Sequence, residues 1–253
     1  VYAGDADVET LEIVLKDTAG EVRVALRYGV FEKLDVVTRS AVIENCGPGP
    51  KMLTKAHTVC IDMPWGDWEW VHFHGRHTME RQVQRLPLLS GIQESSSKRG
   101  ASSHQQNPTV LLCEKDCTED RGGCFGAALM YSGCFQTQIE RDQLGQVRLV
   151  MGLHPDTFRW KLEAGAAFYT PEAILSWSDQ GFAGLSHQFH RVIREHVCRG
   201  KYKLAERPVL INNWEATYFS FDEEKLYNIA EQAAKLGVDM LVMDDGWFGV
   251  RDS

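Results

Sequence analysis

The chain has 253 residues, of which 43% are hydrophobic and 25% are charged, so its composition is that of a folded globular protein rather than a disordered one. Its formal net charge of −8 argues against a nucleic-acid partner, because proteins that bind phosphate backbones carry an excess of Lys and Arg. No stretch reaches the roughly 20 consecutive apolar residues of a membrane span, and the first residues lack a basic segment before an apolar one, so we expect a cytoplasmic protein that contacts no membrane.

Residues 1 to about 170 are predicted to form a succession of short strands rich in Val, Ile, Leu and aromatic residues. Turn-forming residues separate these strands, as in Asn45–Pro50 and Arg121–Gly123. Many short strands with no long helix between them favour a β-sandwich or a related double sheet. The expected strands cover 11–17, 21–31, 35–43, 109–115, 124–133, 146–153 and 158–163.

A polar segment, SSSKRGASSHQQNP at residues 95–108, interrupts this pattern, and a flexible linker is the simplest interpretation of it. Another segment, residues 65–77, places two tryptophans and two histidines at positions of one parity, so that on a strand they line one face: Trp68, Trp70, His72 and His74. Packing between sheets is the default role of this row. A zinc-binding His-x-His pair and an aromatic platform for a glycan stay open as alternatives.

Seven cysteines are scattered along the chain, and four of them gather between Cys113 and Cys134. None forms a C-x-x-C pair, so reduced and half-buried thiols are preferred to a zinc site.

The pattern changes at about residue 171. Apolar residues recur at helical spacing from Phe182 to Ile193, and that helix is expected to end near Gly200. A buried-type strand follows at 207–214.

Ser220 and Glu223 fit a capping box that would begin the next helix, and Gly237 suits the position that ends it. The strand 238–243 comes directly afterwards, so the segment predicts a strand–helix–strand unit with parallel strands. A (β/α)₈ barrel is the first interpretation of this unit. A doubly wound sheet is the second, although no G-x-G-x-x-G loop follows either strand.

Both strands of the predicted unit end in residues suited to a binding site. Trp214 ends the first strand, and Asp244, Asp245 and Trp247 follow the second. Two adjacent carboxylates are costly to desolvate unless donors meet them, and a sugar offers several hydroxyl donors together. A tryptophan ring can cover the less polar face of a pyranose. A solvated Asp-Asp-Gly turn with a positive φ at Gly246 and a site for a divalent cation are the alternatives.

Two motifs and several upstream segments carry a resemblance to a known family. RPVLINNWEATYF (207–219) and LGVDMLVMDDGWFGVRD (236–252) resemble the bacterial α-galactosidases of glycoside hydrolase family 36. Segments 95–108, 121–135, 168–172 and 184–196 resemble segments of that family in the same order, so the likeness covers nearly the whole chain.

The resemblance implies a β-supersandwich followed by the first βαβ unit of a truncated (β/α)₈ TIM barrel. It divides the chain into an incomplete sandwich domain over 1–172, a helical connector over 173–204 and a barrel start over 205–253.

It also implies a retaining α-galactosidase that releases terminal α-linked galactose from raffinose- or melibiose-type oligosaccharides, without a cofactor or a metal. Asp244 and Asp245 would accept hydrogen bonds from galactose hydroxyls, and Trp214 and Trp247 would line the pocket. Both reactive aspartates would lie on later barrel strands, so no catalytic residue is expected in this chain. A non-catalytic carbohydrate-binding or structural module and a metal-dependent barrel hydrolase are the alternative functions.

Two further expectations come from the family. A homotetramer is expected of the full-length protein, and the chain is expected to be an excised part of it. The family usually has Asn where this chain has Cys134, which leaves the role of that position open. Galactose and N-acetylgalactosamine are not distinguished by the sequence, nor are hydrolysis and transglycosylation.

Overall fold

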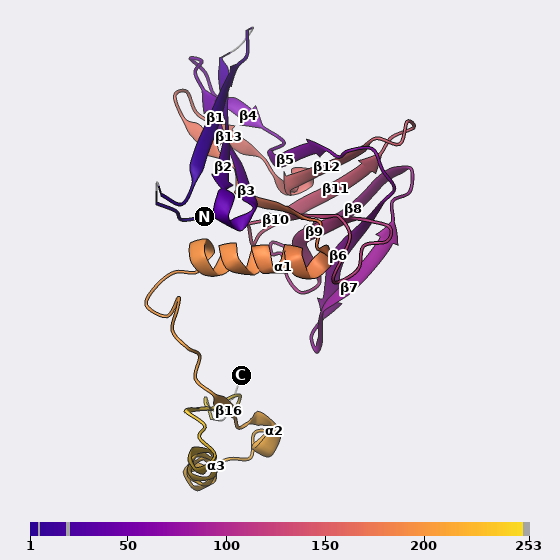
Figure 1. Ribbon diagram of the computed structural model, residues 1–253. Helices are drawn as coiled ribbons and strands as arrows, with labels where there is room; N and C mark the ends of the chain where they lie inside the picture. The colour runs from indigo at the N-terminus through magenta and orange to yellow at the C-terminus, as the bar shows by residue number, and fades with distance from the viewer. Residues whose placement is uncertain (5, 19–20, 250–253) are drawn as a thin grey trace. The chain divides into compact units, whose positions relative to one another are not determined.

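The computed structural model describes residues 1–4, 6–18 and 21–249, and the chain divides into two compact units, Val1–Cys198 and Arg199–Ser253 (Figure 1). The first unit is built mainly of antiparallel strands, and the second contains a pair of parallel strands with helices. None of the helices in these described ranges is long and apolar enough to cross a membrane.

A large antiparallel sheet forms the centre of the first unit (Figure 1). Its strands follow the order β1-β2-β3-β15-β10-β9-β6-β7, and a short ninth strand, β14, pairs with β3. The strands are β1 (Glu9–Lys16), β2 (Val22–Phe31), β3 (Val36–Asn45), β15 (Ala173–Ser178), β10 (Cys124–Leu129), β9 (Gln106–Glu114), β6 (Trp68–Arg76), β7 (Met79–Pro87) and β14 (Ala167–Tyr169).

A smaller sheet packs on one face of the large one, and the main hydrophobic core lies between the two sheets. The smaller sheet has the order β5-β12-β11-β8, and β4 and β13 form a separate two-stranded ribbon. The predicted β-sandwich is therefore confirmed. Its remaining elements are β5 (His57–Asp62), β12 (Val147–Leu153), β11 (Phe135–Arg141), β8 (Gly91–Ser97), β4 (Lys51–Leu53), β13 (Trp160–Leu162) and the short helices η1 (Glu32–Leu34) and η2 (Pro155–Thr157).

Strand β10 contributes apolar side chains to two hydrophobic cores, one on each face of the large sheet. Ala127 and Leu129 belong to the core between the sheets, whereas Cys124 and Ala128 belong to a second core on the opposite face. Successive side chains of a strand point to opposite faces, so one apolar strand can serve both layers.

Helix α1 (Gly181–Val192) covers that opposite face, and a π-helical turn, η3 (Ile193–Val197), follows it (Figure 1). Its buried residues Leu185 and Phe189 lie in the second core. Gly126 of β10 allows this close approach, because a Cβ atom there would lie 2.6 Å from Cε2 of Phe189. The helix predicted from Phe182 is confirmed.

Residues 173–178 differ from the sequence prediction, which assigned them to a helical connector. They form β15, which pairs with β3 on one side and with β10 on the other. Five of its six residues are buried, and periodicity does not separate such a short apolar run from a buried helix. The first residues of the predicted connector therefore lie inside the sheet.

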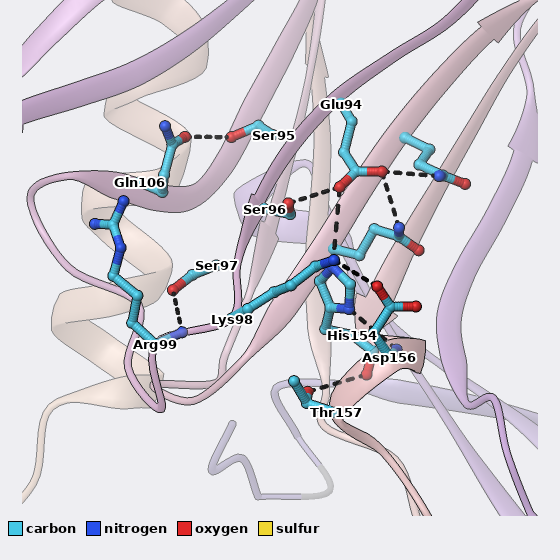
Figure 2. A network of polar contacts seen from close by, with 12 residues as sticks. Glu94, Ser95, Ser96, Ser97, Lys98, Arg99, Gln106, His154, Asp156 and Thr157 are labelled. Atoms are coloured by element: carbon cyan, nitrogen blue, oxygen red, sulfur yellow. Dashed lines mark hydrogen bonds and ion pairs between the residues drawn. The ribbon is translucent and has the colours of Figure 1, made fainter.

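The polar segment 95–108 is also ordered rather than a flexible linker. Its first residues belong to β8, and its last residues begin β9. Figure 2 shows the contacts that hold it: Ser95 Oγ donates to Oε1 of Gln106 at 3.0 Å, and Lys98 pairs with Asp156. The serine side chains of this segment take part in this network at the border of the smaller sheet, which explains why the segment is polar and yet ordered. Composition alone does not reveal such partners.

Two residues of the row on β6, Trp70 and His72, are buried, and the other two, Trp68 and His74, are half-buried. The rings of Trp70 and His72 stack with centroids 4.4 Å apart, and both residues are buried. Burial lowers the pKa of His72, and the neighbouring His74 adds to this effect. The expected role of this row, packing between the sheets, is therefore confirmed for Trp70, which belongs to the core between them.

The cysteines are free thiols. Cys113, Cys117 and Cys124 lie together in the core beneath α1, whereas the sulfur of Cys134 accepts from the backbone N–H of Gly100 at 3.1 Å. Burial raises the pKa of both Cys113 and Cys124 to about 12, so these thiols stay protonated at neutral pH.

The second unit contains two parallel strands, β16 (Leu210–Asn212) and β17 (Met240–Val242), joined through α2 (Trp214–Thr217) and α3 (Glu223–Lys235). The predicted strand–helix–strand unit is confirmed. The helix cap is different: Asp222, not Ser220, is the N-cap of α3, and its side chain accepts from the backbone N–H of Lys225 at 2.9 Å. Gly237 has a φ of 79°, as its predicted position requires.

Candidate functional site

The two parallel strands bring the predicted site residues to one edge. Asn212, the last residue of β16, lies opposite Val242, the last residue of β17. The segments that begin with Asn213 and Met243 therefore leave the strand pair side by side. This places Asp244 close to the residues that follow β16, as the sequence pattern predicts.

Asp244 is fixed by three hydrogen bonds. Its Oδ2 accepts from the side-chain amide of Asn212 at 2.6 Å, and its Oδ1 accepts from the backbone N–H of Asp245 at 2.8 Å. Its own backbone N–H donates to Oδ1 of Asn213, also at 2.8 Å. Both the carboxylate and the main chain at this position are thus held in place.

Asn213 is the buried anchor of this arrangement, with a relative exposure of 0%. Its backbone N–H donates to the carbonyl of Val242 at 3.2 Å, and its side-chain amide donates to Oγ1 of Thr217 at 2.9 Å. The Thr217 hydroxyl in turn donates to the carbonyl of Asn213 at 3.0 Å. One residue therefore connects β17, through its backbone N–H, with α2 and the backbone of Asp244, through its side chain.

Sequence reasoning missed Asn212 and Asn213 as functional residues. The available signal was their place: two amides stand near the end of a predicted strand and directly precede a candidate pocket residue, Trp214. Their partner at Asp244 lies more than 30 residues further along the chain, with separations of 32 and 31 residues. Only the parallel pairing of β16 and β17 brings these groups together.

Asp245 and Trp247 point outward from the same turn. Both residues are exposed, and Trp247 is 67% exposed. Among the described residues, none donates a hydrogen bond to the carboxylate of Asp245. Gly246 between them has a φ of 100°, so the positive φ expected of an Asp-Asp-Gly turn is confirmed.

Trp214 is half-buried at the start of α2. Its ring meets those of Tyr218 and Phe219 edge-on, with centroid separations of 5.3 and 4.9 Å. Tyr218 has a φ of 47°, a conformation that costs free energy in a residue other than glycine and that is frequent at functional sites. The main chain of Trp214 is held as well, because Asn212 Oδ1 accepts from the Trp214 backbone N–H at 2.8 Å.

The structure also shows how two adjacent acids are tolerated here. Asp244 receives neutral N–H donors, and Asp245 faces solvent. Each carboxylate oxygen can accept more than one hydrogen bond, so Asp244 keeps acceptor capacity in addition to these contacts. The oriented carboxylate of Asp244 and the exposed one of Asp245 can accept hydroxyl donors, and the side chains of Trp214 and Trp247 can pack against a ring.

Within the described ranges, no group of three or more His, Cys, Asp or Glu side chains is arranged to hold a metal ion.

Comparisons with known proteins match two consecutive segments of the chain to glycosidase families. Residues 1–163 match the glycosyl hydrolase family 36 N-terminal domain, and residues 167–253 match the melibiase family. The chain is 48% identical over 252 residues to a bifunctional α-galactosidase/sucrose kinase of Mediterraneibacter gnavus, covering 100% of this chain and 27% of that protein. It is 47% identical over 248 residues to an α-galactosidase of Geobacillus stearothermophilus, covering 98% of this chain and 34% of that protein.

Solved structures give the same result. The crystal structure of the Geobacillus stearothermophilus family 36 α-galactosidase AgaA matches with a TM-score of 0.94 and 46% identity, covering 100% of this chain and 35% of that one. The galactosidase domain of the α-galactosidase–sucrose kinase AgaSK matches with a TM-score of 0.92 and 48% identity, covering 100% and 35%. This chain spans only about a quarter to a third of the relatives that it matches, at 27% and 34% of their lengths.

Proposed function

This chain belongs to glycosyl hydrolase family 36, and from that premise we propose that it forms the sandwich domain and the barrel start of a retaining α-galactosidase. The proposed substrates are raffinose- and melibiose-type oligosaccharides, from which terminal α-linked galactose is released. The similar proteins named as α-galactosidases support this proposal. The reactive aspartates are assigned to barrel strands outside this chain, so residues 1–253 alone are expected to be inactive.

The observation that carries the proposal is the edge at which β16 and β17 end. Asp244 and Asp245 offer two carboxylates there, and Asn212 and Asn213 orient the first of them. Active sites of (β/α)₈ barrels form at this carboxyl edge of the strands. We assign Asp244 and Asp245 to galactose hydroxyls, and Trp214 and Trp247 to the walls of the pocket.

Kinetics of the full-length enzyme that carries this segment test the assignment. Asp244→Asn keeps the shape of the side chain and removes its charge, so a hydroxyl held in the transition state would lose a charge-assisted hydrogen bond. We expect kcat/KM for an aryl α-galactoside to fall by an amount equivalent to about 2 kcal/mol or more, roughly 30-fold.

Glu224→Gln is the matched control, because Glu224 is an exposed carboxylate on α3. It is expected to leave kcat/KM unchanged. If Asp244→Asn behaved like this control, the substrate-binding role of Asp244 would be rejected.

Location and assembly are part of the proposal. Seven free cysteines favour a reducing compartment, and we propose the cytoplasm.

Every residue of the edge strand β1 is exposed, including Leu11, Ile13, Val14 and Leu15. An uncovered apolar edge strand favours association, which supports the proposed homotetramer; light scattering of the full-length enzyme would measure it.

A further inference from the structure

We propose that Asn212 and Asn213 are positioning residues that form an amide clamp on Asp244, with Asn212 fixing its carboxylate and Asn213 fixing its main chain. This inference rests on the proposed function, since it concerns how the substrate-binding carboxylate is held. The clamp is defined by three contacts: Asn212 Nδ2 to Asp244 Oδ2 at 2.6 Å, Asp244 N to Asn213 Oδ1 at 2.8 Å, and Trp214 N to Asn212 Oδ1 at 2.8 Å.

The orientation of both amides follows from their partners. A backbone N–H can only donate, so the Asn212 atom that faces the N–H of Trp214 must be Oδ1. Its other terminal atom, Nδ2, therefore faces the carboxylate of Asp244. The same reasoning applies to Asn213, whose Oδ1 faces the N–H of Asp244.

Neutral donors suit this position better than a cation would. An arginine or lysine at position 212 would form an ion pair with Asp244 and reduce its capacity to attract a substrate hydroxyl. An amide instead fixes the rotamer and leaves the negative charge uncompensated for the ligand. Ordering the carboxylate before binding also means that substrate binding need not supply the conformational entropy of that step.

The clamp also separates the roles of the two acids. Asp244 is held by donors on both of its oxygens, whereas Asp245 is exposed and receives no donor from the described part of the chain. We assign Asp244 the directional contact with the sugar and Asp245 an adaptable one.

Asn212→Asp gives the most specific test. The substituted side chain keeps an oxygen to accept from Trp214 N–H, so the loop keeps its contact, but it places a second carboxylate against Asp244 where the amide donor was. At neutral pH the new carboxylate at position 212 and that of Asp244 repel each other, and the adjacent negative charge of Asp245 adds to this repulsion. At lower pH a single shared proton provides an O–H donor in place of the lost N–H.

We therefore expect kcat/KM of Asn212→Asp to fall roughly 100-fold at pH 7.5 and to recover by about 10-fold or more, relative to the parent enzyme, as the pH is lowered to 5. Asn212→Ala lacks both halves of the amide, so it is expected to lose roughly 10-fold with no recovery at low pH. Asn212 is exposed, so both variants are expected to fold.

Asn228→Asp is the matched control, because it makes the same chemical change at an exposed residue of α3. It should keep the parental pH profile. An Asn212→Asp profile that runs parallel to the parent, or an Asn212→Ala variant with parental kcat/KM, would overturn the clamp.

A crystal structure of the Asn212→Ala enzyme provides a readout that needs no activity. The clamp predicts that the Asp244 carboxylate leaves its position once the amide is removed, and an unmoved carboxylate would contradict it. If the parent enzyme hydrolysed no α-galactoside, the proposed function would fail, while this structure would still decide whether the clamp exists.

Discussion

At the residue scale, the site depends on polar groups whose partners lie far away in the sequence. The sequence indicated Asp244, Asp245 and Trp214, because acids and an aromatic residue that directly follow apolar strands are conspicuous. It did not indicate Asn212 or Asn213, since an asparagine near the end of a strand is an ordinary residue before a turn. Their function becomes visible only with the contacts to Asp244.

His57 gives a prediction at the same scale. Burial lowers its pKa from 6.5 to about 4, and the nearby Lys55 adds to the effect. Between these two values the unfolded chain binds a proton that the folded chain does not, so the free energy of unfolding falls as the pH drops from about 6.5 to about 4. Above pH 7 this contribution is constant.

Urea denaturation at pH 7 and pH 5 measures this contribution of His57. We expect His57→Gln to lose less stability between these pH values than the parent chain does. His77→Gln, at a side chain with 93% exposure, should behave like the parent. A His57→Gln variant with the parental pH dependence would show that His57 is not protonated on unfolding.

At the element scale, alternation and helical spacing predicted seven strands of the first unit and helix α1. The strands that were not predicted are β4, β5, β7, β8, β11, β14 and β15. The strands around β2, β3 and β12 and the helix α1 follow clear periodicities. β15 has six residues, most of them buried from both sides, so its pattern contains no alternation. The start of α3 was misplaced for a different reason: Ser220 and Asp222 are both good caps, and the choice between them depends on where the loop turns.

The contact between α1 and the large sheet gives a prediction at this scale. Gly126→Ala would place a Cβ 2.6 Å from the ring of Phe189 and 3.2 Å from Cδ2 of Leu185, so α1 or the ring must move. We expect the free energy of unfolding to fall by about 1–3 kcal/mol, as overpacking does elsewhere. Denaturant titration measures it.

Two further variants check that explanation. Adding Phe189→Leu to Gly126→Ala should restore part of the lost stability, because the smaller side chain makes room for the new methyl group. Gly49→Ala should have a small effect, since no atom lies within 4 Å of its added Cβ. A Gly126→Ala chain as stable as the parent would mean that α1 does not pack on β10 as described.

At the scale of the whole molecule, the sequence anticipated a sandwich followed by a parallel strand–helix–strand unit, and the structure contains both. The three-part division over 1–172, 173–204 and 205–253 stays a prediction. The strand pair β16 and β17 exposes apolar residues such as Leu210 and Met240, as expected where the described residues supply no third strand.

The proposed function requires a galactose ring to bind where β16 and β17 end. A crystal structure of the full-length enzyme with galactose bound would test this. We expect sugar hydroxyls within hydrogen-bonding distance, about 2.5–3.0 Å, of the carboxylates of Asp244 and Asp245, with the ring beside Trp214. A galactose bound in the active site but away from both carboxylates would contradict this placement.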